Sequence, residues 1–147
     1  MRLRAMAKIN LGLDVVRKRE DGYHDVRMVM QTIRMYDFLE ITPKKSKGIF
    51  LTTNLPYVPV DERNLVYKAA KLLMDEFHVD DGVRIQLQKF IPVAAGMAGG
   101  SSDAAATLVG INRIFHLGLT PEELMRRGVA IGADVPYCIL RGTALAE

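Results

Sequence analysis

Little cysteine and the lack of any long apolar segment limit what this protein can be. Its one cysteine, Cys138, has no second cysteine with which to form a disulfide, which fits a reducing cytoplasm. No apolar run is long enough to cross a bilayer. The first residues, Met1-Arg2-Leu3-Arg4, lack the apolar core of a secretion signal. We therefore expect a cytoplasmic protein that has no membrane partner.

A strong charge of either sign is also missing. The chain has 20 lysine and arginine residues against 17 aspartate and glutamate residues, which gives a net charge of +3. This mildly basic balance suits an anionic ligand but is too weak by itself to indicate nucleic acid, and we expect none. The 147 residues, 49% of them hydrophobic, are enough to build the core of one domain.

The most informative stretch is a segment of small residues between a strand pattern and a helix pattern. Polar and apolar residues alternate over residues 83 to 88, whereas apolar residues recur at helical spacing from 104 to 115. The glycines between them let a ligand approach the backbone closely. We expect Ser101 or Ser102 to accept a hydrogen bond from the first helical amides. A helix start of this kind attracts anions, and a nucleotide phosphate is the anion we expect.

This loop does not follow the commonest phosphate-binding patterns. It is not a Walker A loop, because no lysine precedes Ser101, and it contains no Gly-x-Gly of the dinucleotide fingerprint. The plainer alternative is a turn that only connects a strand to a helix. The clustered glycines and alanines, followed by a serine pair, favour the phosphate site.

The loop resembles that of a known superfamily. Pro-x-x-x-Gly-Met-Ala-Gly-Gly-Ser-Ser-Asp-Ala-Ala, which starts at Pro92, is similar to the phosphate loop of the GHMP kinases. The paired glycines before the serines are closest to the 4-diphosphocytidyl-2-C-methyl-D-erythritol kinase family. Ala-Lys-Ile-Asn-Leu from residue 7, Asp-Gly-Tyr-His from residue 21 and Gly-Ala-Asp-Val-Pro from residue 132 resemble further motifs of that family.

The resemblance implies a fold and a domain organisation. The fold is α+β and ribosomal protein S5 domain 2-like, with a mixed β-sheet and helices packed on one face. The family normally carries a second domain of similar size. We therefore expect residues 1–147 to be the N-terminal ATP-binding domain, with the C-terminal GHMP domain, its partner, absent from this chain. Such a piece is expected to have little or no turnover alone.

The resemblance also implies an activity and two catalytic residues. ATP would phosphorylate the 2-hydroxyl of 4-diphosphocytidyl-2-C-methyl-D-erythritol, a step of the non-mevalonate isoprenoid route. Asp134 would deprotonate that hydroxyl, and Lys8 would neutralise charge between the hydroxyl and the γ-phosphate. Mg²⁺ would bridge phosphate oxygens near a serine hydroxyl or Asp103, with its ligands left open. Without the resemblance, Lys8 is a solvent-facing lysine of an edge strand and Asp134 is the cap of a short helix.

The binding residues follow from the same likeness. Asn10, Tyr23 and His24 would hold the cytidine-bearing substrate, because an aromatic face and a tunable donor suit a base. Without the resemblance, Tyr23 and His24 are surface residues beside a turn. Val58 and Val60 would edge the adenine pocket. The residues implied to bind ATP are Asn64, Pro92, Val93, Ala94, Ala95, Gly96, Met97, Ala98, Gly99, Gly100, Ser101 and Ser102.

Two alternatives stay open. One is another GHMP kinase of the homoserine or mevalonate kinase type, against which the Asp-Gly-Tyr-His segment argues. The other is an RNA-binding module on the S5-like fold, encouraged by the basic charge. That alternative requires lysines and arginines gathered on one face with exposed aromatic residues, whereas the basic residues are scattered along this sequence.

Further elements are predicted from local patterns. Alternation predicts strands at residues 8 to 15 and 38 to 42, and a strand or extended segment at 26 to 35. Residues 49 to 53 are expected to pair with 38 to 42 as a hairpin across a lysine-rich turn. Asp61 is expected to cap the next helix, and Thr120 the helix that starts at Pro121.

Overall fold

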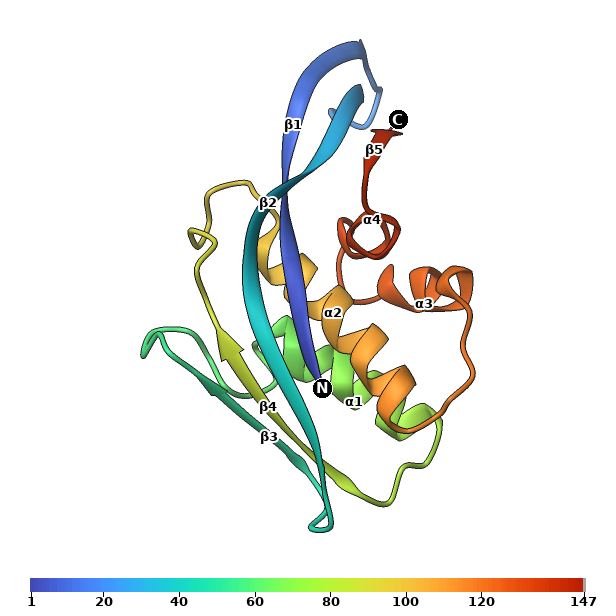
Figure 1. Cartoon of the computed structure of the whole chain (residues 1–147). Coiled ribbons are helices and arrows are strands. Elements are labelled where there is room, and N and C mark those ends of the chain that lie inside the picture. The colour runs from blue at the N-terminus through green and yellow to red at the C-terminus, as the bar shows by residue number, and fades with distance from the viewer. Residues whose placement is uncertain (147) are drawn as a thin grey trace.

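The computed structural model describes residues 1 to 146, which form a mixed sheet with helices on one face (Figure 1). In chain order, the elements are β1 (Arg2–Lys18), β2 (His24–Lys44), β3 (Ile49–Thr53), α1 (Leu65–Glu76), β4 (Gly82–Gln88), α2 (Gly99–Ile114), α3 (Pro121–Gly128), α4 (Val135–Leu140) and β5 (Thr143–Ala146). None of the helices in these residues is both long and apolar enough to span a membrane. The predicted α+β class is confirmed.

The strand order is β1-β2-β4-β3, with β5 also paired to β2. β1 and β2 form a long antiparallel hairpin whose tip extends beyond the helices (Figure 1). β4 is antiparallel to β2 and parallel to β3, with Ile85 opposite both Ile41 and Leu51. The predicted hairpin of residues 38 to 42 with 49 to 53 is therefore wrong. The chain crosses through α1 after β3, as parallel strands require, and inserts β4 between β2 and β3.

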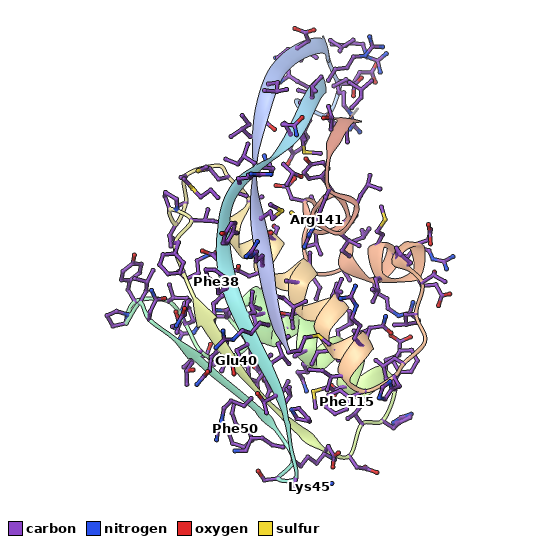
Figure 2. The ribbon with its side chains drawn as sticks, in the orientation of Figure 1. Phe38, Glu40, Lys45, Phe50, Phe115 and Arg141 are labelled. Atoms are coloured by element: carbon purple, nitrogen blue, oxygen red, sulfur yellow. The ribbon has the colours of Figure 1, made fainter. Side chains whose placement is uncertain are left out.

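The hydrophobic core lies between the sheet and the helices α1 and α2. Leu39, Ile41 and Ile85 point from the sheet into it, each at most 1% exposed. Gly110 lets α2 lie close to the sheet, because a Cβ there would be only 2.5 Å from Ile41 Cδ1. Figure 2 shows Phe115 on the side of the helices and Phe38 on the opposite side of the sheet.

Two helix starts test the predicted caps. Asp61 is not the cap of α1, because its carboxylate is held by the Arg63 guanidinium at 2.8 Å. Asn64 caps the helix instead: its Oδ1 accepts from the amide of Val66 at 2.9 Å. The prediction for α3 is confirmed, since the Thr120 hydroxyl accepts from the amide of Glu123 at 3.2 Å.

Candidate functional site

The glycine-rich loop forms one wall of a cleft of about 640 Å³. The cleft also takes in the middle of β1, the turn before α1 and the turn before α4. Most of the predicted site residues line it together: Lys8, Asn10, Asn64, Asp134 and all of residues 92 to 101. Val58 lines it as well. Segments from both ends of the chain are therefore brought to one site.

The loop has a backbone conformation suited to binding an anion. Alternate residues adopt left-handed φ angles, with values of 59° at Ala94, 72° at Gly96 and 55° at Ala98. Such alternation is typical of concave nests whose successive amides converge on an anion. Within residues 1 to 146, none of the amides of residues 96 to 101 donates a hydrogen bond. These donors therefore remain available to a ligand.

The start of α2 differs from its prediction in a way that keeps those amides free. The N-cap is Ala98, and no side chain caps the helix, so the expected cap by Ser101 or Ser102 is wrong. Ser102 is buried and donates its hydroxyl to the carbonyl of Met6 at 2.6 Å. The bulge in β1 between Met6 and Lys8 explains why this carbonyl accepts from a side chain. Ser101 lines the cleft.

Lys8 is a buried cation in the wall of this cleft. Its side chain is on the same face of β1 as that of Asn10, as predicted, and Nζ donates to Asn10 Oδ1 at 3.2 Å. Lys8 is only 6% exposed, so the solvent-facing alternative is wrong. Among the described residues, no carboxylate lies within ion-pair distance of its ammonium. A desolvated cation without a counterion is costly, and an anionic ligand would relieve that cost.

Asp134 lines the same cleft as Lys8. It occupies the N-cap position of the short helix α4, but its side chain makes no capping hydrogen bond, which argues against a purely structural role. Its turn lies next to the start of α2, because a Cβ built on Gly132 would be 3.8 Å from Ser101 Oγ. The predicted catalytic pair is thus brought to one cleft, and the catalytic roles themselves stay a prediction.

Tyr23 and His24 lie apart from this cleft, at the tip of the β1–β2 hairpin. The Tyr23 side chain is 73% exposed, and its amide donates to Asp21 Oδ1 at 3.0 Å. Their assignment to the cytidine stays a prediction. Val60, which was expected to edge the adenine, is also absent from the lining of the cleft, whereas Tyr57 and Arg63 contribute to it.

Sequence reasoning missed a buried ion cluster that borders the cleft. The Lys89 ammonium contacts Asp37 at 2.5 Å and Asp103 at 2.8 Å. Asp103 Oδ1 has no partner among the described residues. Burial raises the pKa of Asp103 well above its usual value, against the opposing pull of Lys89. Burial alone would lower the pKa of Lys89, but the two carboxylates outweigh it and raise that pKa.

A signal for this cluster is present in the sequence. Lys89 directly follows β4 and continues the alternation of Val83, Ile85 and Leu87, so its side chain falls on the buried side of the sheet. Asp37 likewise precedes Leu39 and Ile41 at spacing two. A charged residue on the apolar side of a strand predicts a buried partner of opposite charge.

Comparison with known proteins shows the family to which this chain belongs. A family model described as the GHMP kinases N terminal domain matches residues 64–142. The 4-diphosphocytidyl-2-C-methyl-D-erythritol kinase of Lachnospira eligens is 59% identical over 147 residues, which are 100% of this chain and 51% of the relative. The kinase of that name from Caldicellulosiruptor bescii is 53% identical, with the same coverage. The chain spans about half the length of the curated relatives it matches.

Solved structures share the fold. A crystal structure of a 4-(cytidine 5'-diphospho)-2C-methyl-D-erythritol kinase has a TM-score of 0.86 at 38% identity, covering 99% of this chain and 52% of that one. The mevalonate kinase of Methanococcus jannaschii has a TM-score of 0.78 at 17% identity, covering 100% of this chain and 53% of that one. At this identity the similarity shows a shared fold alone. The predicted ribosomal protein S5 domain 2-like fold is confirmed.

Proposed function

Because this chain belongs to the GHMP kinase family through its N-terminal domain, we propose that it is the ATP-binding domain of a 4-diphosphocytidyl-2-C-methyl-D-erythritol kinase. The observation that carries the proposal is the composition of one cleft. Free loop amides, a buried Lys8 without a counterion and the carboxylate of Asp134 all line it. Phosphoryl transfer needs these groups: donors for phosphate oxygens, a cation and a base.

The chemistry follows from the positions of these groups. The amides of residues 96 to 101 bind the phosphate oxygens of ATP, helped by the positive end of α2. Asp134 accepts the proton of the acceptor hydroxyl, whose oxygen forms a bond to the γ-phosphorus. The bond from that phosphorus to the bridging oxygen breaks, and ADP leaves. Lys8 balances the negative charge that develops between acceptor and phosphate.

The acceptor is assigned from the names of the relatives. Its reacting hydroxyl would lie between Lys8 and Asp134. Asn10 lines the cleft beside Lys8 and would contact the substrate on the side of the hydroxyl that faces the hairpin. The cytidine end would extend along the β1–β2 hairpin toward Tyr23 and His24. The adenine of ATP would lie in the part of the cleft lined by Val58 and Asn64.

The residues of the cleft fit a magnesium ion that arrives with the nucleotide. Within residues 1 to 146, no group of at least three His, Cys, Asp or Glu side chains could hold a metal alone. Magnesium in nucleotide sites commonly combines one or two protein oxygens with phosphate oxygens. Ser101 and Asp134 line the cleft and offer such oxygens, whereas Asp103 is already engaged by Lys89. An ion held there would neutralise phosphate charge.

Calorimetric titration of the folded chain with a non-hydrolysable ATP analogue tests the proposal. We expect saturable binding that is tighter with magnesium, and weaker binding by a Lys8→Met variant. A folded chain that releases no binding heat with the analogue under either condition would contradict the nucleotide site. In a coupled ADP-release assay, the chain alone is expected to show little or no turnover. A panel of acceptor alcohols, assayed with a complete kinase that carries these residues, tests the substrate.

A further inference from the structure

The buried cluster of Lys89, Asp37 and Asp103 takes no part in the proposed transfer. All three residues are at most 8% exposed. Burying several charges is unfavourable unless each is paired and hydrogen-bonded, and replacement by apolar residues is often tolerated or stabilising. Hydrophobic packing alone would therefore serve the fold at least as well, and the position of the cluster beside the glycine-rich loop points to another role.

The cluster holds the chain on the strand side of the loop. Asp37 Oδ1 accepts hydrogen bonds from the amides of Phe90 at 2.5 Å and Ile91 at 2.8 Å. Asn54 makes two hydrogen bonds to the backbone of Lys89, the residue before Phe90. Its Oδ1 accepts from the Lys89 amide at 2.7 Å, and its Nδ2 donates to the Lys89 carbonyl at 3.2 Å. The backbone is therefore fixed where it leaves β4 and enters the loop.

The same cluster holds the helix side of the loop. Lys89 Nζ donates to Asp103 Oδ2 at 2.8 Å, and Asp103 lies near the start of α2. The approach is close, since a Cβ built on Gly99 would lie 3.1 Å from Lys89 Nζ. A residue larger than glycine there would have to displace the ammonium. One side chain thus joins the two ends of the loop across its base.

We propose that Lys89 and Asp103 are positioning residues that close the base of the glycine-rich loop and hold its amides in the converging arrangement. The loop requires such a clamp, because Ala94 and Ala98 adopt left-handed φ angles that are unfavourable for residues with a Cβ. The inference rests on the proposed function for the identity of the ligand, but the order of the loop can be measured without any ligand.

Substitutions at Asp103 separate the bridge from the rest of the cluster. Asp103→Leu removes the acceptor but leaves Lys89 paired with Asp37, so the remaining buried charges stay balanced. Asp103→Asn keeps an oxygen for the Lys89 ammonium and serves as the conservative rescue. Val109→Ala, a partly buried position of the same helix that packs against the core, controls for general loss of stability.

Two measurements are made at a temperature where all variants are folded. The first is the backbone order parameter of amides 93 to 98 by NMR relaxation, which should fall in Asp103→Leu and stay at the original value in Asp103→Asn and Val109→Ala. The second is the affinity for a non-hydrolysable ATP analogue. Asp103→Leu should bind at least about tenfold more weakly, because small displacements of positioning groups carry large penalties.

The outcomes distinguish the two proposals. Equal order parameters for amides 93 to 98 in Asp103→Leu and Asp103→Asn would overturn the positioning role. A looser loop in Val109→Ala as well would overturn it too, because general destabilisation would then account for the change. If the unsubstituted chain binds no nucleotide but its loop loosens only in Asp103→Leu, the positioning role holds and the proposed function fails.

Discussion

The backbone amide of Lys8 donates a hydrogen bond of 3.1 Å to the carbonyl of Met97, so the strand that carries the buried cation is tied directly to the glycine-rich loop. Ser102 adds a second tie to the same strand through the carbonyl of Met6. The ammonium of Lys8 is therefore positioned by the same backbone that presents the free amides. A shift of the loop would move both.

Replacing Lys8 by methionine is expected to raise stability while it removes function. The substitution leaves an unbranched side chain that is one atom shorter and deletes a buried charge without a carboxylate partner, so the free energy of unfolding should rise by about 1 kcal/mol. Denaturant unfolding of this chain measures that change. In a complete kinase with these residues, turnover should fall by a factor of about 10³, because charge stabilisation in the transition state is lost. A destabilised variant with full turnover would contradict both expectations.

The Asp134→Asn variant should separate chemistry from nucleotide binding. The amide has the shape of the carboxylate but does not accept the hydroxyl proton, so turnover in a complete kinase should fall by a factor of about 10² to 10⁴. The affinity for an ATP analogue measured without magnesium should change little, since the loop amides and Lys8 remain. Steady-state kinetics and calorimetry measure the two quantities. Unchanged turnover would remove Asp134 from the role of base.

The Gly96→Ala variant tests the backbone conformation of the loop. Gly96 has a φ of 72° and open space where a Cβ would lie, so the whole effect should come from the backbone. We expect the free energy of unfolding to fall by about 1 kcal/mol. Gly12→Ala is the matched control, because that position is equally open but has no left-handed φ. Thermal unfolding of both variants should show a loss of stability at residue 96 alone.

The raised pKa of Asp103 predicts a specific pH dependence of stability. Burial favours the protonated carboxyl in the folded state, so above pH 3.8 the folded protein binds more protons at this residue than the unfolded chain. Its contribution to stability therefore falls as pH rises from about 4 through the raised pKa. Asp103→Asn removes this effect, and its stability relative to the original protein should increase over that range. Parallel stability curves in denaturant titrations would show that the prediction is wrong.

Features encoded by neighbouring residues were the ones that sequence alone could predict. The alternation in β4 and the Thr120-Pro121 start of α3 each depend on a few adjacent residues, and both are present. The partner of β3 depends on where the crossover through α1 returns the chain, which no local pattern contains. The predicted cap of α1, Asp61, is instead engaged by Arg63, and Asn64 caps the helix three residues later.

The same contrast between local and long-range information applies to the candidate site. The motifs around Lys8 and Asp134 were found through resemblance, and the structure brings both to the predicted loop. Lys89 and Asp37 each extend an apolar alternation, which indicates a buried partner of opposite charge but does not say which residue that partner is. Only the three-dimensional arrangement brings Asp37 and Asp103 to the same ammonium.

β1 is an edge strand of the described sheet, and this has a consequence for the behaviour of the chain in solution. Beyond Asn10, the side chains of Leu11, Leu13 and Val15 are 61%, 54% and 59% exposed. An apolar edge with open backbone groups is a template for a strand from another molecule. Concentrated samples should therefore self-associate through edge-to-edge pairing of their hairpins, and a lysine in place of Leu13 should delay precipitation.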